Sequence, residues 1–143
     1  MTRTVRTTVA GLGIAFFALA PAWAASESYT ADLKGASEVP AVDSKGSGML
    51  NATYDTASKK LTYTVSYKDL SGPATMAHFH GPADAKTNAP VVVPVKDMAA
   101  GTLKGEATLT DAQAADLQGG KWYFNIHTDK NKPGEIRGQV TKK

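Results

Sequence analysis

The sequence predicts an all-β fold, an antiparallel β-sandwich with one short helix. Apolar and polar residues alternate in short segments from about residue 28 onward, which is the period of a strand that buries one face. The segments recur roughly every ten residues, and Gly, Pro, Asn and Asp lie between them, as is typical of sandwiches. Only one stretch carries helix start and stop signals, so strands are expected to build the core.

The first 24 residues are predicted to be a signal peptide. Arg3 and Arg6 give a basic start, residues 9–20 are almost wholly apolar, and Ala22 and Ala24 place small residues where a signal peptidase reads. Cleavage after Ala24 would leave residues 25–143 as a single domain in the periplasm or outside the cell. The apolar run is short for a bilayer span, so no membrane attachment is expected after cleavage.

The charge and cysteine content of the mature region argue against a nucleic-acid partner and exclude disulfide bonds. Without Arg3 and Arg6, 14 of the 16 Lys and Arg residues remain against 13 Asp and Glu, and this balance does not indicate a nucleic-acid partner. Cysteine is absent, so an exported domain of about 119 residues would depend on packing, with a metal as an additional support, and not on disulfides.

Eight strands are expected in the mature region, each an alternating or β-rich segment between turn residues. They are 28–33, 48–54, 61–67, 74–80, 90–95, 102–109, 121–127 and 135–140. Residues 35–43 read as an irregular edge or turn, and residues 55–60 as the connection of a hairpin. The helix is expected at residues 111–118, with Thr110 as its N-cap, Asp111 in its first turn and Gly119 at its end.

The three histidines of the chain lie in two of these strands. His78 and His80 alternate with apolar residues, so they share one face of their strand, and His127 lies in the row opposite the apolar residues of its own strand. Three neutral imidazoles on one surface suit Cu(II) or Zn(II), and copper, which leads the divalent affinity series, is the preferred ion. The alternative is that the rings only bond to backbone or carboxylate groups.

Four ordered motifs resemble the chordin-type (CHRD) domain, over about residues 28–140. They are Ala77-His78-Phe79-His80-Gly81-Pro82-Ala83, Leu117-Gln118-Gly119-Gly120, Trp122-Tyr123-Phe124-Asn125-Ile126-His127-Thr128 and Pro133-Gly134-Glu135-Ile136-Arg137-Gly138-Gln139. The resemblance implies a secreted β-domain: in animals the domain occurs in chordin, an extracellular antagonist of growth-factor signalling, and bacterial members are usually small exported proteins. It does not imply an activity.

A weaker similarity is to Cu,Zn superoxide dismutase, which also uses an antiparallel sandwich of the immunoglobulin-like kind. That family binds copper through a His-x-His pair and further histidines, with an arginine beside the metal. His78, His80 and His127 resemble such a copper set, and the resemblance gives Arg137 the arginine's catalytic place. The departures are that no histidine is left for a bridging or zinc site and that the disulfide is missing.

The predicted site has a second layer of polar residues. A histidine ligand usually passes its other N–H to a carboxylate or carbonyl, and Glu135, Asn125 and Asp129 lie close enough in sequence to serve. The function expected is therefore copper handling or oxidative-stress protection by an exported protein, with superoxide or peroxide turnover open. The alternatives are a metal-free module that binds another exported protein and, last, a zinc-dependent hydrolase.

Overall fold

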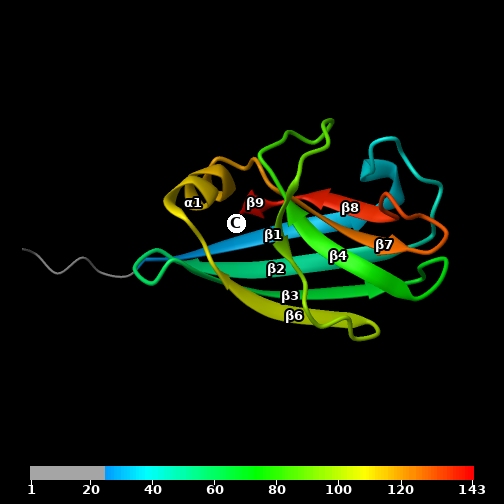
Figure 1. The fold of residues 1–143 in the computed structure, drawn as a ribbon, viewed down its shortest axis with the longest axis horizontal. Helices are drawn as coiled ribbons and strands as arrows, with labels where there is room; N and C mark the ends of the chain where they lie inside the picture. The colour runs from blue at the N-terminus through cyan, green and yellow to red at the C-terminus, as the bar shows by residue number, and fades with distance from the viewer. Residues whose placement is uncertain (1–24) are drawn as a thin grey trace, which may run out of the picture.

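A computed structural model describes residues 25–143 (Figure 1). The predicted signal peptide, residues 1–24, lies outside the described residues. The elements follow one another in the order β1(Ser26–Lys34), a 3-10 turn η1(Gly35–Ser37), β2(Ser47–Asp55), β3(Lys60–Lys68), β4(Ala74–His80), β5(Val91–Pro94), β6(Thr102–Thr108), α1(Asp111–Gln118), β7(Tyr123–Thr128), β8(Ile136–Gln139) and β9(Thr141–Lys142). No helix within residues 25–143 has the length and apolarity that crossing a membrane requires.

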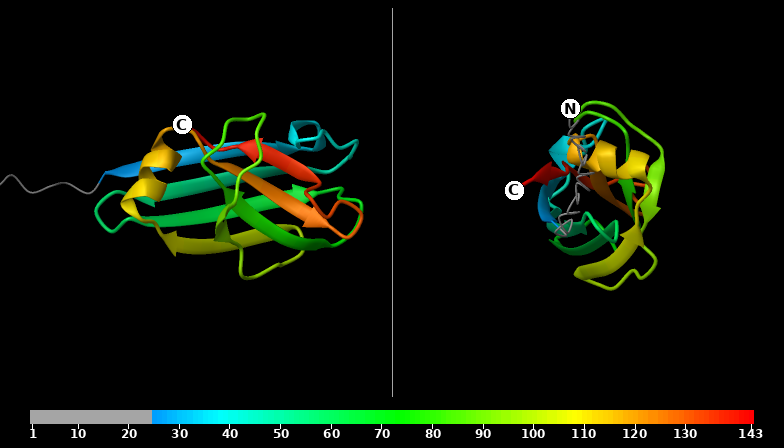
Figure 2. Two further views of the ribbon diagram at one scale, coloured as in Figure 1. Left: turned by 45° about the horizontal axis from the view of Figure 1, so that its top comes forward. Right: turned by 90° about the vertical axis from the view of Figure 1, so that its left-hand side faces the viewer.

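The strands form one folded-over antiparallel sheet, and the predicted sandwich is confirmed in this nearly closed form. The strand order is β5-β4-β7-β8-β1-β2-β3-β6, with β9 pairing off this path to β1. The two halves of the sheet, β5-β4-β7-β8 and β1-β2-β3-β6, face each other when the molecule is viewed along its length (Figure 2). They join where Lys34 of β1 pairs with Arg137 of β8.

The core lies between the two halves and follows the alternation in the sequence. In β3 the buried residues are Leu61, Tyr63 and Val65, and in β7 the inward row includes Phe124 and Ile126. Edge-to-face packing joins the halves, since the ring centroids of Tyr63 and Phe79 lie 5.0 Å apart. Because one row of each strand fills the core, the other row of β4 and β7 is free to build a site.

The helix forms at the expected residues and lies at one end of the sandwich (Figure 1). Thr110 accepts a hydrogen bond from the backbone N–H of Gln113, whose side chain in turn accepts from the Thr110 N–H, so both halves of a capping box form. Ala114 and Leu117 face the core. The helix connects β6 to β7, the strand that contains His127.

Most strand boundaries differ from those expected by one or two residues, and the C-terminal strands differ most. β7 begins at Tyr123 and not at Lys121, and the last predicted strand is divided into β8 and the short β9. The division lies at Val140, whose N–H donates to the Trp122 carbonyl while its side chain is buried in the core. After Val140 the chain no longer pairs with β7, and β9 continues beside β1.

Candidate metal centre

The three histidines converge on the outer face of the β4–β7 pair. In the register of the two strands, His78 lies opposite Asn125 and His80 opposite Tyr123, while His127 lies opposite Met76. The donor atoms of the three imidazoles lie within 4.8 Å of one another. His78 Nδ1 and His127 Nε2 are 3.1 Å apart. The alternation in the sequence therefore placed all three rings on one face correctly.

Backbone carbonyl groups fix the tautomers of two of the rings. His80 Nδ1 lies 2.8 Å from the Ala89 carbonyl oxygen, and His127 Nδ1 lies 2.8 Å from that of Lys132. A carbonyl oxygen only accepts, so each Nδ1 carries the proton and each neutral ring keeps an unshared pair on Nε2. Those two Nε2 atoms are the ones directed into the cluster, which is the arrangement that a metal ion requires of histidine ligands.

Burial keeps the rings neutral near pH 7. Burial, with smaller effects of the neighbouring His127 and His80, lowers the pKa of His78 to about 4. Burial also lowers the pKa of His80 and of His127, although the carbonyl groups of Ala89 and Lys132 act in the opposite direction. The sequence placed the rings away from the core, but His80 and His127 are buried because loops cover this face.

The loop of residues 81–90 covers the site, and Arg137 holds it in place. The guanidinium donates to the carbonyl oxygens of Asp84 and Thr87 and to Asn88 Oδ1, at 3.2, 2.8 and 2.8 Å. Arg137 is almost completely buried. Ala89, whose carbonyl fixes the His80 tautomer, is in the same loop, so Arg137 acts on the histidines through the loop.

Tyr123 lies between Arg137 and His80. β7 is the strand between β4 and β8, so its Tyr123 ring has His80 on one side and Arg137 on the other. The His80 and Tyr123 rings are stacked at a centroid distance of 4.7 Å, and the guanidinium carbon lies 3.4 Å from the Tyr123 ring centroid. Arg137 was expected beside the metal, but the structure places it behind the Tyr123 ring.

Glu135 does not lie among the imidazoles, where it was expected to orient a ring. Its carboxylate accepts hydrogen bonds from the hydroxyl groups of Ser44, Ser71 and Thr128 and from the Ser71 backbone N–H. Burial alone would raise the pKa of Glu135, but these donors together lower it to about 2. Glu135 therefore ties the segments before β2 and β4 to the end of β7.

This carboxylate gives stability a defined pH dependence. Because its pKa is lower in the folded state, its contribution is complete above about pH 5 and is lost as the pH falls toward 2. Glu135→Gln is expected to lower the free energy of unfolding by about 2 kcal/mol at pH 7, because a charge-assisted set of hydrogen bonds is lost.

Urea titrations at pH 7, 4 and 2.5 measure this effect as a difference between Glu135→Gln and the unsubstituted protein. The difference should shrink as the pH falls. Glu106→Gln, which removes an exposed carboxylate on β6, is the matched control and should change little. A Glu135→Gln difference that stays constant with pH contradicts the role given to this carboxylate.

The other two expected residues have different positions. Asn125 lies within the cluster, where its Oδ1 is 3.0 Å from His80 Nε2 and 3.0 Å from His127 Nε2. Asp129 is exposed after the end of β7 and has no hydrogen bond to the three imidazoles in the described part of the chain. The polar surroundings expected of the site thus reduce to Asn125.

Glu38 was missed by the sequence reasoning. Its side chain is buried near Asn125 and Arg137, and among residues 25–143 its Oε1 has no hydrogen-bond partner. Burial raises the pKa of Glu38 to about 7, although Arg137 and Asn125 lower it. Glu38 follows the 3-10 turn in a segment without strand periodicity, so no signal in the sequence placed it near the histidines.

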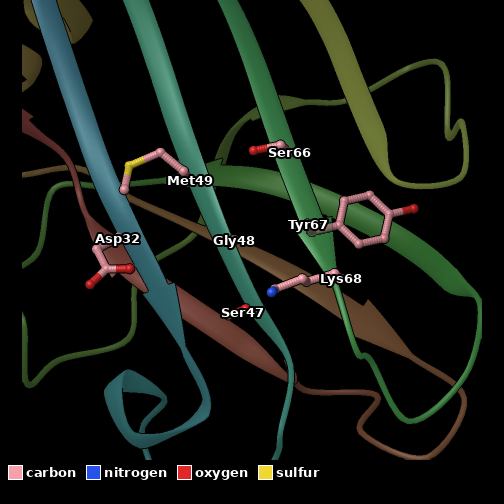
Figure 3. Close-up of a pocket in the computed structure, with 7 residues that line it drawn as sticks. All are labelled: Asp32, Ser47, Gly48, Met49, Ser66, Tyr67 and Lys68. Atoms are coloured by element: carbon pink, nitrogen blue, oxygen red, sulfur yellow. The ribbon is translucent and has the colours of Figure 1, made fainter.

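A separate hollow lies on the other half of the sheet, on the outer face of β1, β2 and β3 (Figure 3). Its lining residues are Asp32, Ser47, Gly48, Met49, Ser66, Tyr67 and Lys68. This set contains one carboxylate, that of Asp32, and no histidine, so it offers few ligands to a metal ion. The candidate site of this protein is therefore the histidine cluster and its covering loop.

Comparison with known proteins supports the resemblance carried by these motifs. No curated protein matches the chain, and no solved structure matches it. The CHRD domain family matches residues 29–140, which include most of β1, all of β2 to β8, the helix and all three histidines. The chain therefore belongs to the CHRD domain family.

Proposed function

We propose that this protein is exported and binds one copper ion through His78, His80 and His127, for copper handling or protection against oxidative stress. The observation that carries the proposal is the convergence of three imidazole donors from β4 and β7 within 4.8 Å. The carbonyl groups of Ala89 and Lys132 support it, because they leave unshared pairs directed inward.

The chemistry of the donors favours copper over other ions. Imidazole nitrogen binds Cu(II), Zn(II) and Ni(II), and Cu(II) has the highest affinity of the common divalent ions for such a set. Hard ions such as Mg²⁺ and Ca²⁺ require several carboxylate or carbonyl oxygens, and the cluster contains no carboxylate. Zinc is the competing ion. Export is supported by the basic start and apolar run of residues 1–24, which resemble a signal peptide.

A competitive titration of the purified protein with Cu(II) and with Zn(II) tests the proposal. We expect one Cu(II) per chain with a dissociation constant below about 1 μM and weaker binding of Zn(II). His80→Ala and His127→Ala should each weaken Cu(II) binding by about 100-fold or more, since each removes one of three nitrogen ligands.

The control is Met49→Leu, which removes an exposed sulfur donor from the other half of the sheet. Its Cu(II) affinity should equal that of the unsubstituted protein. Absence of stoichiometric binding at micromolar Cu(II), or equal affinity in the histidine variants, contradicts the proposal. Metal analysis of protein from the native periplasm or medium then identifies the ion that is bound in the cell.

A further inference from the structure

We infer that Asn125 Oδ1 is the fourth ligand of the metal, so that the centre consists of three imidazole nitrogens and one amide oxygen. The inference rests on the proposed function, because it concerns the same site. It assigns Asn125 a direct bond to the ion in place of the supporting position that its sequence suggested.

The first argument is a conflict between hydrogen-bond acceptors. Asn125 Oδ1 lies 3.0 Å from Nε2 of His80 and 3.0 Å from Nε2 of His127. The protons of both rings are on Nδ1, where they serve the Ala89 and Lys132 carbonyl groups. In the neutral cluster His78 Nδ1–H can donate to His127 Nε2, but no proton is left between His80 Nε2 and Asn125 Oδ1. The unshared pairs of these two acceptor atoms therefore repel each other. A cation bound by both atoms removes this repulsion.

The second argument concerns the orientation of the amide. The Asn125 Nδ2 atom is 3.5 Å from the Pro133 carbonyl oxygen and lies near the buried Glu38 carboxyl group. Both the Glu38 carboxyl group and the Asn125 amide approach Gly134 where a Cβ atom would be, and a larger residue there would separate them. Turning the amide over would direct Oδ1 at the Pro133 carbonyl oxygen. The contacts of Nδ2 therefore favour the orientation in which Oδ1 faces the imidazoles.

The third argument is the spacing of the four donor atoms. His78, His127, Asn125 and His80 follow one another at donor separations of 3.1, 3.0 and 3.0 Å. Ligands about 2.0–2.1 Å from a metal are roughly 2.9 Å apart at right angles and about 3.4 Å apart in a tetrahedron. The observed values are nearer the right-angled set.

The two rings that Asn125 Oδ1 bridges, those of His80 and His127, are also the two imidazoles of the cluster that lie farthest apart. The ring centroids of His80 and His127 are 6.4 Å apart, compared with 5.5 Å for His78 and His80 and 5.0 Å for His78 and His127. This difference is expected when His80 and His127 provide opposite donors of a square-planar set of four ligands. Tetragonal sets of nitrogen and oxygen donors favour Cu(II), whereas zinc prefers the tetrahedron.

Electron–nuclear double resonance on the Cu(II)-loaded full chain, labelled with ¹³C at the asparagine side-chain carbonyl, tests the bond directly. We expect a ¹³C coupling from a carbonyl carbon one bond beyond a ligand atom, and no strongly coupled exchangeable water in the copper plane. In Asn125→Ala the ¹³C coupling should disappear, an exchangeable water should appear, and Cu(II) affinity should fall about 10-fold.

Asn125→Asp protects the test against a folding defect in Asn125→Ala, because it preserves the shape of the side chain. Its anionic oxygen should bind Cu(II) about 10-fold more tightly and change the g values of the copper spectrum. Asn51→Ala is the matched control, since Asn51 is an exposed asparagine on β2 whose Oδ1 accepts from Lys143 on the protein surface. It should leave the ¹³C coupling and the Cu(II) affinity unchanged.

The possible outcomes separate this inference from the proposed function. Nitrogen couplings of three imidazoles without the ¹³C coupling, or with a bound water already present before substitution, would overturn the Asn125 bond and leave the histidine site intact. No binding of Cu(II) by the unsubstituted chain would overturn both. A ¹³C coupling that persists in Asn125→Ala would assign it to another asparagine and overturn the inference as well.

Discussion

Replacing Gly138 with alanine is expected to lower the free energy of unfolding by about 3 kcal/mol or more. Gly138 lies in β8 beside the junction with β1, and a Cβ atom there would overlap the Asp32 carbonyl oxygen and carbon and press on the Leu33 side chain. Backbone atoms of a paired strand cannot yield as a flexible side chain does. The two halves of the sheet would have to move apart at their junction.

Thermal and urea denaturation followed by circular dichroism measure this loss, which should lower the midpoint temperature by about 10 °C or more. Gly72→Ala is the control, because among residues 25–143 no atom beyond Gly72 and its two chain neighbours lies within 4 Å of the position that its Cβ would occupy. That variant should unfold at the same temperature or slightly higher, since alanine restricts the unfolded chain more than glycine does. Equal midpoints for the two variants contradict the close approach at Gly138.

Replacing Arg137 with methionine is expected to weaken both the fold and the site. Methionine keeps a long unbranched stem but removes the guanidinium, and with it the hydrogen bonds to Asp84, Thr87 and Asn88 and the stacking on Tyr123. We expect a loss of about 3 kcal/mol in the free energy of unfolding. Cu(II) affinity should fall about 10- to 100-fold, because the loop would no longer hold the Ala89 carbonyl against His80.

Denaturation and Cu(II) titration of the same preparation check the two effects together. Lys104→Met, which removes an exposed cation from β6, controls for the change in charge and should alter neither quantity. An arginine that acted only by attracting an anion to the metal would change turnover and leave stability as it was. Unchanged stability and affinity in Arg137→Met would therefore contradict its role as the anchor of the loop.

The sequence predicted the strands well because their alternation reflects direct contact with one core. In β3, polar residues alternate with Leu61, Tyr63 and Val65, and those three are buried. The same period predicted the shared face of His78, His80 and His127, and it also placed Asn125 in the row of His127. A strand keeps its period whatever lies beside it, so the row of each side chain was predictable.

The cover of the site could not be predicted, because it depends on contacts between distant irregular segments. Arg137 reaches carbonyl groups in the loop after β4, and any residue could supply such carbonyl groups. The same holds for the Ala89 and Lys132 carbonyl groups that set the imidazole tautomers. Glu135 was expected near the histidines because of its place in the sequence. Its carboxylate instead binds the hydroxyl groups of Ser44, Ser71 and Thr128, away from the three imidazoles.

The convergence of β4 and β7 has a consequence for a chain that has no cysteine. His78 and His127 are 49 residues apart in sequence, and β5, β6 and α1 lie between them. A copper ion held by both strands would act as a reversible cross-link that closes this long loop, much as a disulfide does. Loading the ion would then slow the opening of the domain and protect it from proteases, and a chelator would reverse that protection.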